Sequence, residues 1–541
     1  MKFCKLFFAF LFCWLILSVQ TVFSQQPSTD TVRQVEILSA SRLQFLRPND
    51  STELQILSGK VRLKQGNTLF DCDSCVINNR LHIFQAFGHV HINDADTANV
   101  NSDNLLYHTD KRVAYLTGNV RLTDGKATLT TSNLEYDVDT KLGIYTNGGK
   151  VVNKKTVITS SEGYYYTDLK DVYFKKNVEL KDPSYYLKAD SLLVNTETEI
   201  ARFIAETFIR DSSGRTVTTR EGYYDSRNRK AEFGGKAVIH DGPRTIKGNT
   251  ITTDDSIGVS TIVGNATVID TAQNTIVIAG IILSNQKTNS FIAYNKPLMI
   301  VKQEEDSVYI TADTLFSARL TDLYGTKDSV RKDTIRGKQV VDANNKDSTN
   351  RYFEAYHHVR IFSDSVQSVC DSLFYSFKDS VFRLYQRPVV WSKENQITGD
   401  TILLFTKNKK ADRLKVYDNS FMVSKVQGEF FNQVKSARMD GFFTEGSLDS
   451  VLARGYAECI YYVQDEDSAF TGINQSSSDA IDIYFTPDST GKQRELTKVV
   501  FRTDVKGTLW PMRLKTAEEM RLENFQWLEG RRPKTKYELF Q

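Results

Sequence analysis

The sequence predicts an all-β, elongated repeat protein of stacked antiparallel strands, and three observations carry this prediction. A short motif returns about every thirty residues along most of the 541-residue chain. Within each repeat, apolar and polar residues alternate with a period of two, which is typical of half-buried strands. The chain holds only 9 prolines, whereas Thr, Val, Ile, Tyr and Phe, which favour strands, are abundant. Because stacked repeats share one continuous core, we expect one elongated unit rather than several compact domains.

Composition and charge exclude several functional classes. The 69 Lys and Arg residues nearly balance the 66 Asp and Glu residues, which leaves a net charge of +3. Because no segment is strongly cationic, a protein that binds nucleic acid is not expected. The 40% of apolar and 11% of aromatic residues can support a core, which argues against a wholly disordered chain. A single long apolar run argues against a protein with several membrane helices.

Residues 1–24 have the features of a secretory signal peptide. Lys2 and Lys5 precede an unbroken apolar run over residues 6–17, and Ser24 provides a small residue before a cleavage point at Gln25. Ser18 ends the run short of a membrane span, although an uncleaved anchor is the alternative. We therefore expect the protein to be exported.

Four cysteines follow the predicted signal peptide. Cys72 and Cys75 have C-x-x-C spacing, but a zinc ribbon needs a second such pair, and a redox motif needs the pair to open a helix rather than lie in a strand. Cys370 and Cys459 stand alone. We expect ordinary strand cysteines, with a local Cys72–Cys75 disulfide as the alternative in an oxidising compartment.

Two columns of residues define the repeat. In the first, a small residue and Asp, Asn or Ser stand between pairs of alternating apolar residues, as in residues 100–107 and 187–194. This column advances by 28 to 34 residues through Asn104, Asn133, Gly163, Ser191, Gly222, Thr250, Gly280 and Thr314. In the second column, Gly precedes a variable residue and usually Val, at Gly59, Gly88, Gly118, Gly149 and Gly264. Each repeat therefore holds two strand-like halves separated by polar turns.

The first column also predicts where the strands bend. Apolar residues alternate by two on each side of the small–polar pair, but the phase shifts by one residue across it. A straight strand cannot keep one face buried through such a shift, whereas a bulge or corner can, and the polar side chain can bond backbone groups that leave the ladder. We expect corners at Ser102–Asp103, Ala189–Asp190, Gly248–Asn249, Ala312–Asp313 and Gly399–Asp400, with Asp103, Asp190, Asn249, Asp313 and Asp400 as the structural corner residues.

The regularity of the repeat changes along the chain and predicts its organisation. Regular repeats extend over residues 25–320, and less regular copies extend over residues 351–511. Between them, the polar stretch 321–350 is expected to be an inserted surface loop, with a docking loop as the alternative. Residues 512–541 are expected to form a helical cap over the last strand, because the stretch from Thr516 to about Gly530 favours helix and carries Met520, Phe525 and Trp527.

The recurring motifs resemble those of a known family. The alternation of an apolar–Asp–apolar–Tyr motif with Gly-Asn-Val, as in residues 102–120, is similar to the OstA/LptA family of periplasmic lipopolysaccharide-transport proteins, over residues 35–391 and more weakly to residue 511. The resemblance implies a twisted, V-shaped β-jellyroll whose apolar interior shields lipid acyl chains during transport to the outer membrane. It also implies a periplasmic location, either free or associated with the outer membrane, and end-to-end strand addition with other envelope transport components.

On this resemblance, lipopolysaccharide or a related lipid is the expected partner. Its acyl chains would contact the apolar positions that follow each corner, with ordinary core packing as the alternative for every one of them. These candidates for lining a lipid cleft are Leu105, Tyr107, Leu134, Tyr136, Leu192, Val194, Ile251, Leu315, Leu373, Tyr375 and Ile402.

Two other functional classes are alternatives. A β-helix enzyme acting on polysaccharides would need a local cluster of carboxylates, whereas the Asp residues here recur once per repeat. His89 and His91 share one strand face without an acidic partner to complete a metal site, and neither a nucleophile elbow nor a phosphate-binding loop occurs. We therefore expect no catalytic residue, no metal and no cofactor. A structural or adhesive surface repeat protein is the main alternative, and it would have a filled interior.

Overall fold

The computed structural model describes residues 34–49, 52–95, 97–302, 307–324, 350–407, 410–444, 446–465, 469–487 and 494–540. The predicted signal peptide and most of the predicted insertion lie outside this description. Within it, the all-β prediction is confirmed, because forty strands stack in antiparallel pairs and the α-helix described is the single turn α2 (Leu320–Tyr324). No helix in this part of the chain is long and apolar enough to cross a membrane.

The chain forms two compact units, where the repeat predicts one continuous unit. Unit 1 comprises residues 1–153 and 161–171, and unit 2 comprises residues 154–160 and 172–541. The division falls among short strands: β9 (Leu142–Tyr145) has 4 residues and β10 (Gly149–Asn153) has 5, against 11 residues in β6 (Ala98–His108). A regular spacing of motifs does not reveal this local shortening of the ladders.

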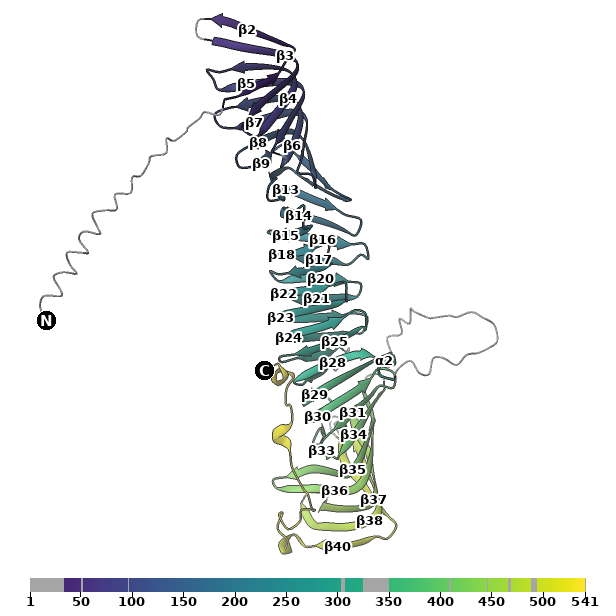
Figure 1. The fold of residues 1–541 in the computed structure, drawn as a ribbon. Helices are drawn as coiled ribbons and strands as arrows, with labels where there is room; N and C mark the ends of the chain where they lie inside the picture. The colour runs from purple at the N-terminus through teal and green to yellow at the C-terminus, as the bar shows by residue number, and fades with distance from the viewer. Residues whose placement is uncertain are drawn as a thin grey trace, which may run out of the picture. The chain divides into compact units, whose positions relative to one another are not determined.

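Unit 1 is a stack of strands (Figure 1), and its long strands, such as β6, have two halves. Residues 98–101 of β6 pair with the end of β5, and residues 104–108 pair with its beginning. The halves that lie side by side therefore form a first wall and a second wall, which meet at the corners. The other strands of unit 1 are β1 (Glu36–Ser39), β2 (Arg42–Asn49), β3 (Thr52–Gln65), β4 (Thr68–Asn78), β5 (Ile83–Asp94), β7 (Val113–Thr123), β8 (Thr128–Asp137) and β12 (Glu162–Tyr166).

Each corner of unit 1 is a β-bulge with two sides. The ladder between β5 and β6 skips Asp103, which stands opposite the two residues Gly88 and His89. These two residues have left-handed φ values of 71° and 44°, and the next pair along the chain, Gly118 and Asn119, has 77° and 46°. The Asp column and the Gly column of the sequence are therefore the two sides of one corner.

The side chains at these corners interlock. Asn119 Nδ2 donates a hydrogen bond of 2.8 Å to Asp103 Oδ2, and His89 Nδ1 lies 2.7 Å from Asp73 Oδ2. A Cβ atom added to Gly118 would lie only 2.5 Å from Asp103 Oδ2. Glycine is therefore required here both for its left-handed φ and for the space that the carboxylate occupies.

We expect the substitution Gly118→Ala to destabilise unit 1 by about 2–4 kcal/mol, because a left-handed alanine costs about 1–2 kcal/mol and the clash with Asp103 adds to it. The matched control is Gly125→Ala, since Gly125 has a φ of 84° but nothing within 4 Å of an added Cβ. Urea denaturation of both variants measures the difference. Equal losses of stability would show that the contact with Asp103 contributes nothing.

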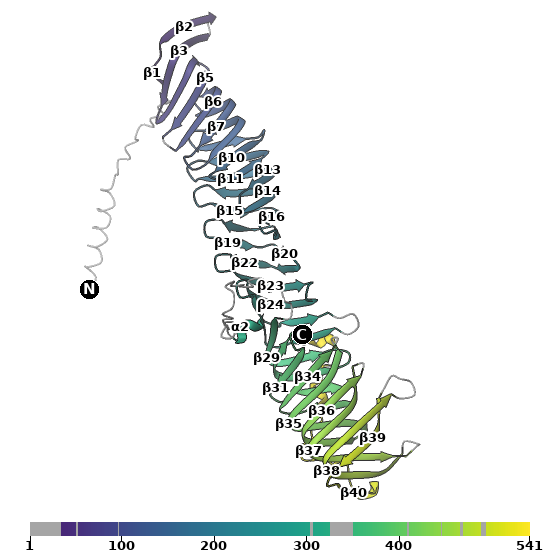
Figure 2. The ribbon, with the colours of Figure 1, turned by 90° about the vertical axis from the view of Figure 1, so that its right-hand side faces the viewer.

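Unit 2 repeats the same plan with more strands, as Figure 2 shows. Its first wall includes β26 (Leu298–Val301), β27 (Val308–Thr311) and the C-terminal half of β29 (Arg351–Phe362), and its second wall includes the N-terminal half of β29, β31 (Val381–Tyr385) and β34 (Thr401–Lys407). The other strands are β11 (Thr156–Ser160), β13 (Asp171–Lys181), β14 (Tyr185–Asn195), β15 (Ile200–Phe203), β16 (Thr207–Asp211), β17 (Thr216–Thr219), β18 (Gly222–Asp225), β19 (Lys230–Phe233), β20 (Ala237–Asp241), β21 (Arg244–Gly248), β22 (Thr250–Asp254), β23 (Val259–Asp270), β24 (Thr275–Asn285), β25 (Ser290–Tyr294), β28 (Thr314–Arg319), β30 (Gln367–Ser376), β32 (Val389–Ser392), β33 (Asn395–Thr398), β35 (Lys410–Gln427), β36 (Phe430–Thr444), β37 (Ser447–Gln464), β38 (Phe470–Pro487), β39 (Arg494–Arg502) and β40 (Lys506–Trp510).

The ladders of unit 2 are also interrupted at the corner positions. One strand ends and the next begins on either side of Asn249, Asp313 and Asp400. At Asp190, β14 continues but changes partner from β16 to β15. Asn419 Nδ2 donates a hydrogen bond of 2.9 Å to Asp400 Oδ2, which repeats the corner contact of unit 1.

The prediction of a C-terminal helix is wrong. Residues 511–540, the C-terminal strap, contain only three 3-10 turns, Met512–Leu514, Glu529–Arg531 and Lys536–Leu539. The strap does not simply cap the last strand, because it runs across unit 2 and ends beside β27 and β29 (Figure 1). Its Met520 packs on Ile473 of β38, its Leu528 packs on Trp391 of β32 and its Leu539 packs on Phe362 of β29.

Buried glutamines provide the hydrogen bonds that a helix would have made internally. Gln433 donates from Nε2 to Met520 O at 2.9 Å and accepts from the Leu522 N–H at 2.8 Å. Gln396 holds residues 526–528 in the same two-point manner, at 2.8 and 2.6 Å. Because these contacts satisfy an extended backbone, the apolar side chains of the strap reach separate patches that one helix face could not span.

Candidate functional site

The predicted cleft-lining residues lie in the interior of the two units. Ten of them are at most 8% exposed, and Tyr375 is half-buried. The ten enclosed residues are Leu105, Tyr107, Leu134 and Tyr136 in unit 1, and Leu192, Val194, Ile251, Leu315, Leu373 and Ile402 in unit 2.

Aromatic rings fill part of the interior of unit 1. Phe70 of the first wall packs against Phe84 and Tyr107 of the second wall, with ring centroids 5.2 and 4.7 Å apart. All three side chains are at most 1% exposed. The interior of unit 1 around these rings is therefore a packed core, as ordinary strand packing predicts.

Polar side chains join the free ends of the two walls of unit 1, opposite the corners. Asp94, at the end of the first wall, is 1% exposed. It accepts hydrogen bonds from Thr68 Oγ1 at 3.0 Å and from Tyr136 OH at 2.8 Å, and Lys141 Nζ lies 2.5 Å away. Burial, together with the charge of Asp94, raises the pKa of Tyr136 above its ordinary value. Tyr136 therefore remains a hydrogen-bond donor, and this seam holds the walls together.

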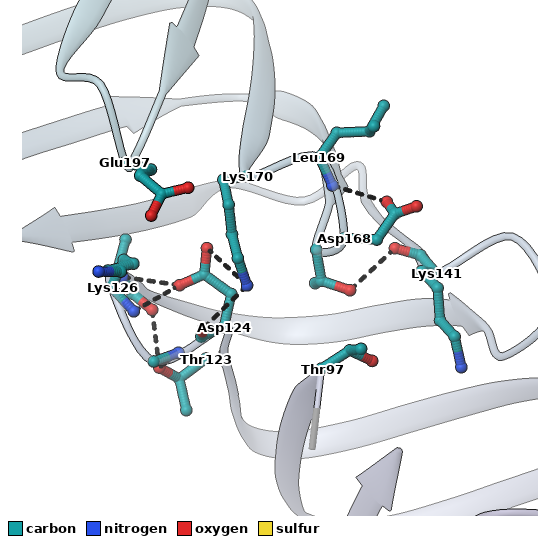
Figure 3. Close-up of polar contacts among 12 residues, drawn as sticks. Thr97, Thr123, Asp124, Lys126, Lys141, Asp168, Leu169, Lys170 and Glu197 are labelled. Carbon is teal, nitrogen blue, oxygen red and sulfur yellow. Dashed lines mark hydrogen bonds and ion pairs between the residues drawn. The ribbon is translucent and has the colours of Figure 1, made fainter. Parts of the chain in front are cut away.

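The next repeat of the seam centres on Asp124, whose side chain is fully buried. Figure 3 shows Lys170 extending toward Asp124, with Nζ 3.1 Å from the Asp124 backbone oxygen and 4.0 Å from Oδ2. Asp124 Oδ1 also accepts from the N–H groups of Lys126 and Ala127, at 2.7 and 2.8 Å. The Asp124 carboxylate thus stabilises the turn in which it lies and also contacts Lys170 of a later turn.

These seam residues belong to neither of the two columns that predicted the fold, although they form a third column. Steps of 29 or 30 residues separate Gln65, Asp94, Asp124, Asn153, Asp182, Asp211, Asp241 and Asp270. Their cationic partners show the same spacing, since Lys141 and Lys170 lie 29 residues apart. The regular step was therefore a signal that could have identified the seam.

Arginines bridge the walls in part of unit 2. Arg215 Nε lies 2.9 Å from Asp211 Oδ2, at the end of β16, and its Nη2 lies 3.2 Å from Asp255 Oδ2, just after β22. Arg244 likewise reaches Asp270 Oδ2 at 3.0 Å and Asn289 Oδ1 at 3.2 Å. A planar guanidinium can contact two acceptors in this way.

Between the walls of unit 2 lies a cavity of about 360 Å³. Strands β26, β27, β29 and β30 line it from the first wall, and strands β29, β30, β31, β34 and β35 line it from the second. Turn residues from the free ends of the walls form its rim. The lining residues are Ala272, Gln273, Asn274, Met299, Val301, Val308, Ile310, Phe353, Ile361, Ser363, Ser365, Val366, Ser368, Tyr375, Phe377, Ser380, Phe382, Leu384, Leu404, Thr406 and Ala411.

The lining of this cavity is uncharged and mostly apolar, with Ser, Thr, Asn and Gln side chains among the apolar ones. No Asp, Glu, Lys, Arg or His is among its lining residues. Tyr375, the one predicted cleft residue among them, packs on Phe382 and Phe377 with ring centroids 4.3 and 5.0 Å apart. Burial raises the pKa of Tyr375, so its hydroxyl stays neutral. Such a cavity favours an uncharged, apolar ligand group.

The four cysteines in the described part of the chain are buried on strands β4, β30 and β37, and none of them forms a disulfide. Hydrogen bonding to Cys72 and burial raise the pKa of Cys75, and burial raises the pKa of Cys459 to about 12. Buried neutral thiols such as those of Cys75 and Cys459 are poor nucleophiles, whereas the hydrogen bond with Cys75 lowers the pKa of Cys72. Among the described residues, no group of three or more His, Cys, Asp or Glu side chains is placed to hold a metal ion.

Comparison with known proteins identifies one segment. The family model described as OstA-like protein matches residues 32–190. The N-terminal segment is OstA-like. This match covers less than half of the chain. Over residues 32–190 it supports the resemblance to the OstA/LptA family, which is of the lipopolysaccharide-transport type and generally periplasmic. No curated protein gives a significant match to the chain.

The OstA-like segment and the cavity occupy different parts of the sequence. Residues 32–190 include the corners and the seam of unit 1 and end at the Asp190 corner of unit 2. The cavity is lined by residues between 272 and 411. The repeat plan of the OstA-like segment thus continues in unit 2, where the interior encloses space.

Proposed function

We propose that this protein is an envelope lipid-binding protein of the lipopolysaccharide-transport type. It would act in the periplasm and shield acyl chains of lipopolysaccharide or a related lipid in its apolar interior on the way to the outer membrane. The cavity of unit 2 carries the proposal, because it is a mostly apolar space between two walls and no charged residue lines it. No catalytic step is part of this function.

The size of the cavity suits part of an acyl chain. A water molecule takes up about 30 Å³ of the liquid, and a methylene group is similar in size, so the cavity of about 360 Å³ has room for on the order of ten methylene groups. Each methylene that leaves water contributes about 0.8 kcal/mol. Transfer of an acyl chain into this space would therefore be favourable without any ionic contact, and the lipid headgroup would stay outside.

The N-terminal edge of unit 1 supports contact with another envelope component. Strand β2 pairs with β3 and carries the exposed side chains Leu43, Phe45 and Leu46, of which Phe45 is 60% exposed. An exposed apolar edge strand can pair with a strand of another chain. We propose that end-to-end strand addition occurs at β2.

The packed interior of unit 1 supports a second candidate function, a structural or adhesive β-repeat protein. The enclosed rings of Phe70, Phe84 and Tyr107 are what that function predicts. The two candidates differ in unit 2, because a purely structural repeat has no use for an apolar cavity.

Photo-crosslinking in cells tests the proposal. Benzoylphenylalanine at Tyr375 is expected to crosslink to a lipid, because Tyr375 lines the cavity in which the acyl chain would lie. The same group at Tyr107, in the packed core, and at the exposed Tyr115 should give no lipid adduct. Mass spectrometry of the adducts identifies the lipid. Crosslinks from position 375 to protein alone would support the structural function instead.

A further inference from the structure

The cavity and the C-terminal strap lie on opposite faces of the same strands. Along β26, Leu298 and Ile300 contact the cluster around strap residue Leu539, whereas the intervening Met299 lines the cavity. Along β27, Tyr309 faces the strap, and its two neighbours face the cavity. Side chains of a strand alternate between its two faces, so the first wall is a single layer between the strap and the cavity.

The last residues of the strap, 536–540, fix this wall from outside. Leu539 is 5% exposed and packs on Leu298 and Phe362. Arg360 of β29 contacts Glu538 twice, with Nη1 3.3 Å from its backbone oxygen and Nη2 3.3 Å from Oε2. Tyr309 lies against Phe540, with ring centroids 6.4 Å apart. Three strands are thus held by one turn of chain, which we call the latch.

We propose that the latch controls how fast the cavity exchanges its ligand. The inference rests on the proposed lipid-binding function and adds a regulatory element to it. Leu539 of the latch packs in a cluster with Leu298, Ile300, Tyr309 and Phe362. None of these four residues lines the cavity. It therefore acts as a positioning element, through the wall on which it packs.

The physical basis is the packing of the wall on both of its faces. A strand covered by other groups on both faces has little freedom to move, because closely packed interiors transmit displacement rather than absorb it. With the latch in place, the first wall keeps its distance from the second wall, and a chain leaves only through the rim. With the latch released, strands β26, β27 and β29 lose their outer contacts, so the walls separate more often and the ligand exchanges faster.

The experiment compares two matched leucines of the strap in the full chain. Leu539→Ala weakens the latch, and Leu522→Ala removes a similarly buried leucine that packs on β35 to β38 instead. A single-chain fluorescent fatty acid, dansylaminoundecanoic acid, is bound to each protein and then displaced in a stopped-flow instrument. We expect dissociation to accelerate at least about fivefold in Leu539→Ala and less than about twofold in Leu522→Ala.

A milder variant guards against loss of folding. Glu538→Ala removes the side-chain contact with Arg360 and leaves Leu539 in place, and it should accelerate dissociation to an intermediate degree while the circular dichroism spectrum stays native. If the parent protein binds the probe and all three variants release it at the parent rate, the latch proposal is wrong and lipid binding stands. If the parent protein binds no probe, both the latch and the proposed function are overturned.

Discussion

A chain that ends at Trp510 is expected to lose the native packing of the C-terminal part of unit 2. The strap buries Met520, Leu522 and Leu539, each at most 9% exposed, and burial of one such side chain contributes about 1.5–3 kcal/mol. Its removal would also uncover Trp391, which is fully buried. The summed loss of apolar burial is comparable with the whole stability of an ordinary domain, about 5–15 kcal/mol.

Hydrogen exchange with mass spectrometry measures this effect and localises it. Peptides from β30 to β38 should exchange much faster in the truncated chain, whereas peptides from β4 to β8 of unit 1 serve as the internal control. A finer variant, Gln433→Met, keeps the size of the side chain but leaves the Met520 carbonyl and the Leu522 N–H without their partner. It should lose about 1–3 kcal/mol. Unchanged hydrogen exchange in both variants would show that the strap does not stabilise the strands on which it packs.

The substitution Asp94→Ala is expected to destabilise unit 1 by about 3 kcal/mol, because removal of one member of a buried ion pair leaves its partner uncompensated. Lys141, with 22% of its side chain exposed, can turn partly toward water. The expected loss of stability therefore lies at the lower end of the range for broken buried ion pairs. The Tyr136 hydroxyl, in contrast, stays in the interior without its acceptor. Urea denaturation monitored by tyrosine fluorescence reports the loss.

The matched control for Asp94 is Asp71→Ala in the same unit. Asp71 pairs with Arg62 at 2.6 Å, but the Arg62 side chain is 54% exposed. Exposed ion pairs contribute about 0–1 kcal/mol, so this variant should stay close to the parent protein. Equal losses from the two aspartates would show that the seam stabilises no more than a surface contact does.

The fold could be predicted from the sequence because its signals are local. The period-two alternation of a strand, the phase shift at Asp103 and the facing Gly118 on the next strand are all visible within about thirty residues. The strap could not be predicted in this way. Its hydrogen bond from Gln433 to Met520 spans 87 residues, and that from Arg360 to Glu538 spans 178, so the local preference of residues 516–530 for helix gives way to distant contacts.

The candidate site was predicted less well than the fold. Alternation identifies which side chains point inward, as it does for Leu105 and Tyr375, but it gives no volume between the walls. Whether that space is filled depends on the sizes of facing side chains such as Phe70 and Tyr107, which belong to different repeats. The seam, by contrast, left a regular signal at Asp94 and Asp124 that a search for further columns would have found.

The two-sided corner has a consequence for how such a chain can change in length. Strands with a polar corner residue such as Asp103 alternate with strands that carry a left-handed pair such as Gly118 and Asn119. Duplication or loss of a single strand would set two corners of the same kind against each other, without the partner that each requires. Gain or loss of two strands preserves every contact. Genetic variation in proteins with this repeat should therefore add or remove whole hairpins, so that chain length changes in steps of about thirty residues.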